Sequence, residues 1–191
     1  MTNTDDGRLA RGAVRRDLLL DSAVRVVADI GSGALTHRAV ASEAGVSVAS
    51  VTYHFPSISD LRSSTLQHAG SRIGMQLVGL VSDATARVED TPDICAAFAV
   101  RLVEEQRVDT AAVFELIVAA GHDESLRPVV GAFNGYLANL LTPYIGDPDR
   151  ALRVGASIQG LVLVHLASSS STSDLGAAVA DLIRRFRSTL T

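Results

Sequence analysis

The sequence predicts an all-helical protein with three short helices followed by about six more. Apolar residues recur at helical spacing along much of the 191-residue chain, as at Leu19, Ala23, Val26, Val27 and Ile30. Long period-two runs separated by turn pairs, the pattern of paired strands, do not occur. Apolar residues make up 47% of the chain and charged residues 20%, which is typical of a globular protein with a filled core.

Nine segments have this helical pattern, separated by Gly, Pro and polar residues. Residues 1–10 are polar and are expected to be disordered. Ser59 or Asp60 is expected to cap the fourth helix. The expected helices cover about residues 13–30, 37–44, 48–55, 60–86, 92–107, 110–120, 125–144, 148–168 and 174–189.

The second and third helices have the pattern of a helix-turn-helix. Thr36 and Ser47 can cap the two helices, and Gly45 can take the left-handed conformation that ends the earlier one. Ala41 is small enough for the later helix to cross closely, and Val51 can anchor that helix to the core. In this motif the later helix enters the DNA major groove. A plain helical hairpin also uses Gly at its corner, so the spacing alone leaves that alternative open.

The outward positions of the third helix are small or can form hydrogen bonds, which suits a groove better than a core. Ser and Thr hydroxyls can bond bases or phosphates, and Val, Ala or a Thr methyl can touch a thymine methyl. Phe55 is expected to pack in the core. The predicted DNA-binding residues are Thr36, His37, Ser47, Val48, Ala49, Ser50, Thr52, Tyr53 and His54.

The net charge of −4 does not exclude nucleic acid, because the charge is unevenly distributed. Residues 1–62 are neutral overall, and residues 63–191 supply the excess of acids. The chain has no lysine, so its 17 fixed cations are all arginines, whose planar guanidinium suits phosphate. An arginine cluster near the N-terminus forms either a solvated helix face or a phosphate-binding group. Its members are Arg8, Arg11, Arg15 and Arg16.

Residues 13–62, and above all "LTHRAVASEAGVSVASVTYHFPSISDL", resemble the tetracycline-repressor-like (TetR) family of bacterial transcription regulators. In that family a Thr opens the second helix and an Ala-Gly-Val-Ser run forms the turn. An aromatic-rich helix end then leads through Phe-x-Ser to a long fourth helix. The matching residues are Thr36, Ala44, Gly45, Val46, Ser47, His54, Phe55, Ser57 and Leu61.

Three positions depart from the pattern of the family that the sequence resembles. Ala49 stands where the family usually has Gly, and Thr52 where it usually has Tyr; the tyrosine follows one place later, at Tyr53. Ser59 replaces a Lys that often meets a phosphate just before the fourth helix. Arg62 or the N-terminal arginines are expected to compensate for that contact.

The resemblance implies that the remaining helices form a ligand-binding and dimerisation domain, whose last two helices pair with a second subunit in a four-helix bundle. Residues 148–168 are apolar almost all round, so this segment has more than one face to bury. Gly155 and Gly160 could let another helix approach it closely. The last helix has one apolar stripe, which consists of Leu175, Val179, Leu182, Ile183, Phe186 and Leu190.

Polar and aromatic residues within these apolar helices are the candidate effector contacts. They are Phe98, Phe114, Glu115, Asn134, Tyr136, Gln159 and His165. Glu115 interrupts "AAVFELIVAA" and is expected to be largely buried. There it either pairs with Arg101 or Arg107, or recognises a cationic or hydroxylated ligand. The others are either satisfied core residues or pocket groups.

The sequence has no pattern for catalysis, a cofactor or a metal ion. P-loop, GxSxG, HExxH and paired-carboxylate motifs are missing. The run His122-Asp123-Glu124 is interpreted as a solvated helix end, because three adjacent residues cannot face one ion from a regular helix. Cys95, the only cysteine, is interpreted as an inert, half-buried thiol. Neither a membrane span nor an export signal is visible, so a cytoplasmic protein is expected.

These patterns predict an N-terminal arm and helix-turn-helix domain at residues 1–58, and a ligand-binding and dimerisation domain at residues 59–191. The first hypothesis is a homodimeric repressor that binds a pseudo-palindromic operator in double-stranded DNA and is released by a small-molecule effector. The alternative is a helical small-molecule or protein-binding module with this fold that does not read DNA. An enzyme is not expected.

Overall fold

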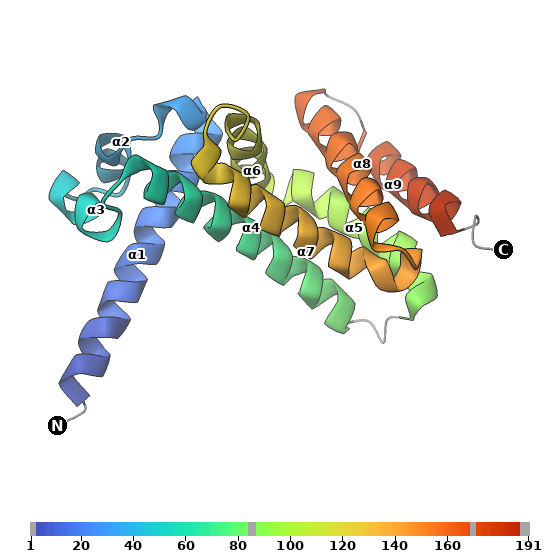
Figure 1. Cartoon of the computed structure of the whole chain (residues 1–191), viewed down its shortest axis with the longest axis horizontal. Helices are drawn as coiled ribbons and strands as arrows, with labels where there is room; N and C mark the ends of the chain where they lie inside the picture. The colour runs from blue at the N-terminus through green and yellow to red at the C-terminus, as the bar shows by residue number, and fades with distance from the viewer. Residues whose placement is uncertain (1–2, 84–86, 169–170, 188–191) are drawn as a thin grey trace. The chain divides into compact units, whose positions relative to one another are not determined.

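A computed structural model describes residues 3–83, 87–168 and 171–187, and the regular elements in these ranges are all helical, which confirms the predicted fold class (Figure 1). The α-helices are α1 (Asn3–Ile30), α2 (His37–Glu43), α3 (Val48–His54), α4 (Ile58–Asp83), α5 (Thr91–Glu104), α6 (Arg107–Ala119), α7 (Arg127–Ile145), α8 (Pro148–Ala167) and α9 (Thr172–Arg187). Three short 3-10 helices join them: η1 (Ser32–Ala34), η2 (Val88–Asp90) and η3 (Glu124–Leu126). Residues 84–86 and 188–189 of the predicted helices, and Leu190 of the predicted stripe, lie outside the described residues.

Helix α1 begins at Asn3, so the expectation of disorder over residues 1–10 was wrong from residue 3 onward. The segment "RLARGAVRR" is rich in Arg, Ala and Leu, which have high helix propensity, and this preference outweighs its polarity. The helix ends at Ile30 as predicted, because Gly31 takes φ +85° and its N–H donates to the Val27 carbonyl at 2.9 Å.

Helix α4 is capped by Ser57, and the prediction that Ser59 or Asp60 caps it was wrong. The Ser57 hydroxyl accepts from the Asp60 N–H at 3.0 Å, and the Asp60 carboxylate accepts from the Ser57 N–H at 3.2 Å. Two N–H groups that have no partner within the helix are thereby satisfied, as in a capping box. Asp60 is the acidic partner of this box, three residues after its cap.

The chain divides into two compact units, which are described separately. Unit 1 consists of residues 1–69 and 111–127, and unit 2 of residues 70–110 and 128–191. Within unit 1, α2 packs against α1 and against α3, and η1 packs against α1. Its fully buried apolar side chains include Leu19, Val27, Leu35, Val40, Val51, Leu61 and Leu116. The functional boundary between residues 58 and 59 remains a prediction.

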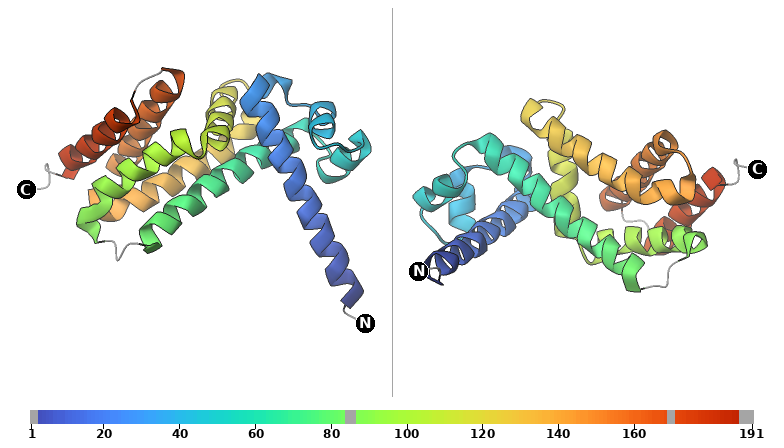
Figure 2. Two further views of the ribbon diagram at one scale, coloured as in Figure 1. Left: turned by 180° about the vertical axis from the view of Figure 1, so that it is seen from behind. Right: turned by 60° about the horizontal axis from the view of Figure 1, so that its bottom comes forward.

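Within unit 2, α5 lies along α9, and α8 packs against both of them (Figure 2). The predicted stripe of α9 provides much of this contact: Leu175, Val179 and Ile183 are buried. An ion pair between Arg184 of α9 and Asp93 of α5, at 2.6 Å, crosses the edge of the α5–α9 contact.

Aromatic rings of α7 lie directly over glycines of α4 within unit 2. A Cβ added at Gly70 would meet the Phe133 ring at 3.1 Å, and a Cβ added at Gly74 would meet the Tyr136 ring at 3.0 Å. Both distances are tighter than ordinary side-chain contacts, so the two glycines allow α7 to approach α4 closely.

Candidate nucleic-acid interface

The interface begins with the capped first turn of α2. The Thr36 hydroxyl accepts from the Ala39 N–H at 3.1 Å, which confirms the predicted N-cap. The neighbouring His37 is half-buried, and its Nε2–H donates to the carbonyl oxygen of Phe55 at 2.7 Å. This bond ties the start of α2 to the end of α3. It commits one ring nitrogen of His37 to the fold and leaves Nδ1 for any contact with DNA.

The turn between α2 and α3 is a Schellman motif centred on Gly45. Gly45 has φ +63°, its N–H donates to the Ser42 carbonyl at 3.3 Å, and the Val46 N–H donates to the Ala41 carbonyl at 2.9 Å. These two bonds satisfy carbonyls at the end of α2 that have no partner within the helix. The predicted left-handed terminator is therefore confirmed.

Two buried side chains fix α3 on the body of unit 1. Val51 is 0% exposed and Phe55 1% exposed, so both predicted anchors are confirmed. The Ser47 hydroxyl caps the helix by accepting from the Ser50 N–H at 3.2 Å. The guanidinium of Arg16 on α1 lies 5.0 Å from the centroid of the Phe55 ring and donates to the Ser64 hydroxyl of α4 at 3.0 Å.

The predicted DNA-binding residues all lie in unit 1, and each is exposed or half-buried. Among the larger side chains of this set, Tyr53 is the most exposed, at 82%. Its ring contacts the His54 ring edge-on, with 5.2 Å between the two ring centroids. The Thr52 hydroxyl donates to carbonyls of its own helix, at 3.3 Å to Val48 and 3.2 Å to Ala49. Thr52 therefore offers DNA an acceptor oxygen and a methyl group rather than a free donor.

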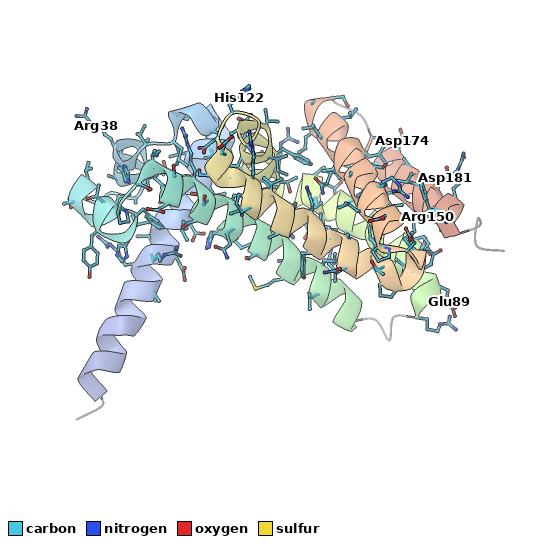
Figure 3. The ribbon with its side chains drawn as sticks, viewed as in Figure 1. Arg38, Glu89, His122, Arg150, Asp174 and Asp181 are labelled. Atoms are coloured by element: carbon cyan, nitrogen blue, oxygen red, sulfur yellow. The ribbon has the colours of Figure 1, made fainter. Side chains whose placement is uncertain are left out.

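Arg38 is a further candidate contact that the sequence prediction did not include, although it directly follows the predicted contacts Thr36 and His37. Its side chain is exposed and extends outward from α2 (Figure 3). No ion pair or hydrogen bond joins it to another described residue. Its position in the first turn of α2, two residues after the cap, could have identified it from the sequence.

Arg62 takes part in an ion pair within unit 1. It is half-buried, and its Nη1 donates to the Asp123 carboxylate at 3.1 Å. The guanidinium therefore joins α4 to the turn between α6 and α7 within unit 1, and the phosphate contact expected of it remains a prediction. Among the N-terminal arginines, the other alternative, Arg15 is exposed.

The candidate effector contacts are divided between the two units. Phe98, Asn134, Tyr136, Gln159 and His165 belong to unit 2. Within it, the Gln159 amide of α8 donates to the Asn134 side-chain oxygen of α7 at 3.1 Å. Phe98 is 7% exposed and Tyr136 39% exposed, so the first is a core residue of α5 and the second is open at its edge.

Phe114 and Glu115 belong to unit 1, and the expectation that Glu115 is buried with Arg101 or Arg107 was wrong. Glu115 is exposed, and its carboxylate accepts from the Ser32 N–H at 3.3 Å and from the Ser32 hydroxyl at 3.5 Å. It satisfies the first turn of η1. The apolar run around it packs by its other faces, through the buried Val113 and Leu116.

Neither a cluster of metal-binding side chains nor a membrane-spanning helix occurs among the described residues. They contain no group of three or more His, Cys, Asp or Glu that could hold a metal ion. Their helices include none whose length and apolar character would allow it to cross a membrane.

Family comparisons match both parts of the chain. The family described as "Bacterial regulatory proteins, tetR family" matches residues 19–64, and "Tetracyclin repressor-like, C-terminal domain" matches residues 86–188. The second match alone covers more than half of the 191 residues. A search of curated proteins found no match.

Solved structures resemble the chain over almost its full length. The multidrug binding protein EbrR, crystallised with ethidium, is 27% identical with a TM-score of 0.76, over 90% of this chain and 97% of EbrR. A TetR-family member from Streptomyces coelicolor A3 is 29% identical with a TM-score of 0.74, over 88% of this chain and 97% of that protein. A transcriptional regulator from Rhodococcus sp. Rha1, 19% identical with a TM-score of 0.81 over 91% and 96%, shares the fold.

Proposed function

Because the chain belongs to the TetR family of bacterial regulatory proteins, we propose that it is a transcriptional repressor that reads operator DNA through α3 and releases it on binding a small molecule. The main support is the geometry of α3. This short helix is capped by Ser47 and held down by Val51 and Phe55, while its other positions are small or polar and open to solvent.

The residues of the helix-turn-helix divide into two proposed roles. Ala49, Ser50 and Thr52 are short, so α3 can sit deep in the major groove and bring them to base edges. Tyr53 and Arg38 are long and exposed, and they would meet phosphates on either side of the groove. The bond between His37 and the Phe55 carbonyl keeps α2 and α3 in register, so that both sets reach DNA together.

We further propose that the protein acts as a homodimer in the cytoplasm and binds a pseudo-palindromic operator. Two copies of α3 about one DNA turn apart would read the two half-sites. The exposed apolar side chains of α8 support pairing of the last two helices. They are Leu152, Leu163 and Val164.

For the effector, we propose a small organic molecule bound within unit 2. EbrR was crystallised with imidazole, ethidium, malachite green and proflavin. The half-buried pair of Gln159 and Asn134 offers a donor and an acceptor between α8 and α7. Effector binding would favour a state with lower operator affinity, and a coupling of about 1–3 kcal/mol is usual for such systems.

Ethidium is a practical first probe of this effector site. Its fluorescence anisotropy should rise and saturate when the protein is added without DNA. Gln159→Ala should weaken binding, whereas Glu115→Ala, in unit 1, should leave it unchanged. Equal losses in both variants would contradict the proposed location.

The DNA-binding proposal is tested by selecting bound duplexes from a random pool and titrating them in gel shifts. Tyr53→Ala should weaken binding to every duplex, because phosphate contacts carry no sequence information. Ser50→Ala should instead change the preferred bases at one position of each half-site, at a cost of about 1–3 kcal/mol for the original sequence. If no duplex is enriched and none is bound in low salt, the protein is the alternative, a binding module that does not read DNA.

A further inference from the structure

The N-terminal part of α1 projects from unit 1 and has a cluster of arginines. We propose that it is a second DNA-binding element, which holds phosphates that flank the half-site read by α3. This inference rests on the proposed function and enlarges the interface beyond the helix-turn-helix. The chemistry recognised is the phosphate backbone of duplex DNA.

The first observation is that residues 13–18 of α1 bury no side chain, although Arg16 contacts Ser64 and the Phe55 ring. All six are exposed, Val14 at 70%, and burial begins at Leu19 in this described stretch. A Cβ added at Gly12 would meet no atom within 4 Å. In Figure 1 and the left view of Figure 2, the dark blue start of α1 extends beyond α2 and α3 without a neighbouring helix.

The second observation is charge without an internal partner. Arg15 is exposed, and no ion pair or hydrogen bond joins it to another described residue. Helix positions 8, 11 and 15, all arginine, fall on one face of a regular helix. Arg16 has a different role. Its guanidinium contacts the Ser64 hydroxyl and the Phe55 ring, and so fixes α1 beside the end of α3.

The dimensions suit a contact just outside the half-site. Sixteen residues of α1, Asn3 to Leu18, precede the first buried one, and at about 1.5 Å per residue they span about 24 Å. That length corresponds to about seven base pairs at 3.4 Å each. Because α1 and α3 belong to the same unit, the projecting segment of α1 starts from the unit that also contains the proposed recognition helix.

The sequence of this segment also makes its helix one that DNA contacts would stabilise. Gly7 and Gly12 weaken the helix, and a helix without tertiary packing is marginal in water. Phosphates along one side would neutralise the arginines that repel one another and so stabilise the helix. We therefore infer that operator binding stabilises the helix of this segment.

Two substitutions test this in opposite directions, with the full-length protein and the selected operator. Arg15→Ala should weaken operator and random duplexes by the same factor, and should reduce the slope of log K against log salt by about 0.9. Gly12→Ala should tighten operator binding by about threefold to fivefold, the factor that matches the helix penalty of one glycine. Both sites are exposed or open, so the fold is not at risk.

The matched control is Arg87→Ala, an exposed arginine before η2 in unit 2, which should change neither the affinity nor the slope. An equal change in the Arg87 variant would mean that only net charge matters and would overturn the proposal. So would normal operator binding in both Arg15→Ala and Gly12→Ala. A wild-type protein that binds no DNA at all would refute the proposed function instead.

Discussion

Asp123 shows how one carboxylate organises the turn between α6 and α7. Its side chain accepts from the Ser125 hydroxyl at 2.6 Å and from the Ser125 N–H at 3.1 Å, and it pairs with Arg62 at 3.1 Å. The Ser125 hydroxyl and the Arg62 guanidinium both stabilise the charged form, so they lower the pKa of this carboxyl below its ordinary value of 3.8. The predicted solvated run at His122–Glu124 thus has a structural residue at its centre.

A pH-dependent contribution to stability follows from this lowered pKa. Because the folded pKa lies below the unfolded value of 3.8, the stabilisation is complete above that value and is lost as pH falls through the folded pKa. Asp123→Asn should therefore lower the free energy of unfolding by up to about 1 kcal/mol at pH 7, because the amide keeps an acceptor that can cap η3 but loses the negative charge that pairs with Arg62. Urea melts at pH 7 and at about pH 3 should show the difference shrinking in acid. A difference that is constant with pH would exclude the charge as its cause.

Cys95 is a second residue whose surroundings set its chemistry. Burial in α5 raises the pKa of this thiol to about 12, so the sequence interpretation of an inert thiol holds, although the side chain is buried rather than half-buried. At pH 8 only about one thiol in ten thousand would be ionised. We expect Ellman's reagent to label the native protein over hours and the guanidinium-unfolded protein within minutes. Stoichiometric labelling of the native protein at the unfolded rate would show that the site opens readily.

At the scale of the elements, the turn of the helix-turn-helix depends on backbone conformation alone. Gly45 has φ +63°, and a Cβ there would meet nothing within 4 Å, so an alanine would be strained without any clash. Gly45→Ala should therefore cost about 1 kcal/mol and lower Tm by about 2–4 °C. Gly33→Ala is the matched control, because Gly33 is equally open and its φ is not positive; it should shift Tm by less than 1 °C. Calorimetry of the two variants measures both values, and similar shifts would contradict a conformational cause.

The difference between local and long-range interactions explains which features could be predicted from the sequence. Caps at Thr36 and Ser47, and the terminator Gly45, depend on neighbours within five residues, and all three were predicted. Contacts between segments that lie far apart in the sequence were not predicted. Glu115 binds Ser32, which lies 83 residues away, and Arg62 binds Asp123, which lies 61 away.

The exact residue at which a helix begins was also difficult to predict from the sequence. The cap of α4 was placed two or three residues late because Ser57, Ser59 and Asp60 are all plausible caps. Only the reciprocal bonds between Ser57 and Asp60 distinguish them. The roles proposed for Ala49, Ser50 and Tyr53 remain predictions, since they depend on a DNA molecule whose position neither the sequence nor the fold defines.

At the scale of the whole molecule, α8 has one apolar face that is buried and another that remains exposed. One face is buried within unit 2 at Ala151, Val154 and Val162. The opposite positions Leu163 and Val164 remain 42% and 65% exposed. Adjacent exposed apolar side chains on one helix are typical of a surface that is covered in the assembled protein.

If that surface pairs two copies, one charge at its centre should separate them. Val164→Glu should shift the protein from dimer to monomer in sedimentation equilibrium, because an unpaired carboxylate would be buried against apolar side chains. Operator affinity should fall by at least about a hundredfold, since two linked heads gain that much over one. Val118→Glu is the control: Val118 is 67% exposed on α6, in unit 1, and its variant should stay dimeric and bind normally. A Val164→Glu protein that remains dimeric would rule out this face of α8 as the interface, and a loss of operator affinity without dissociation would place the effect elsewhere in the molecule.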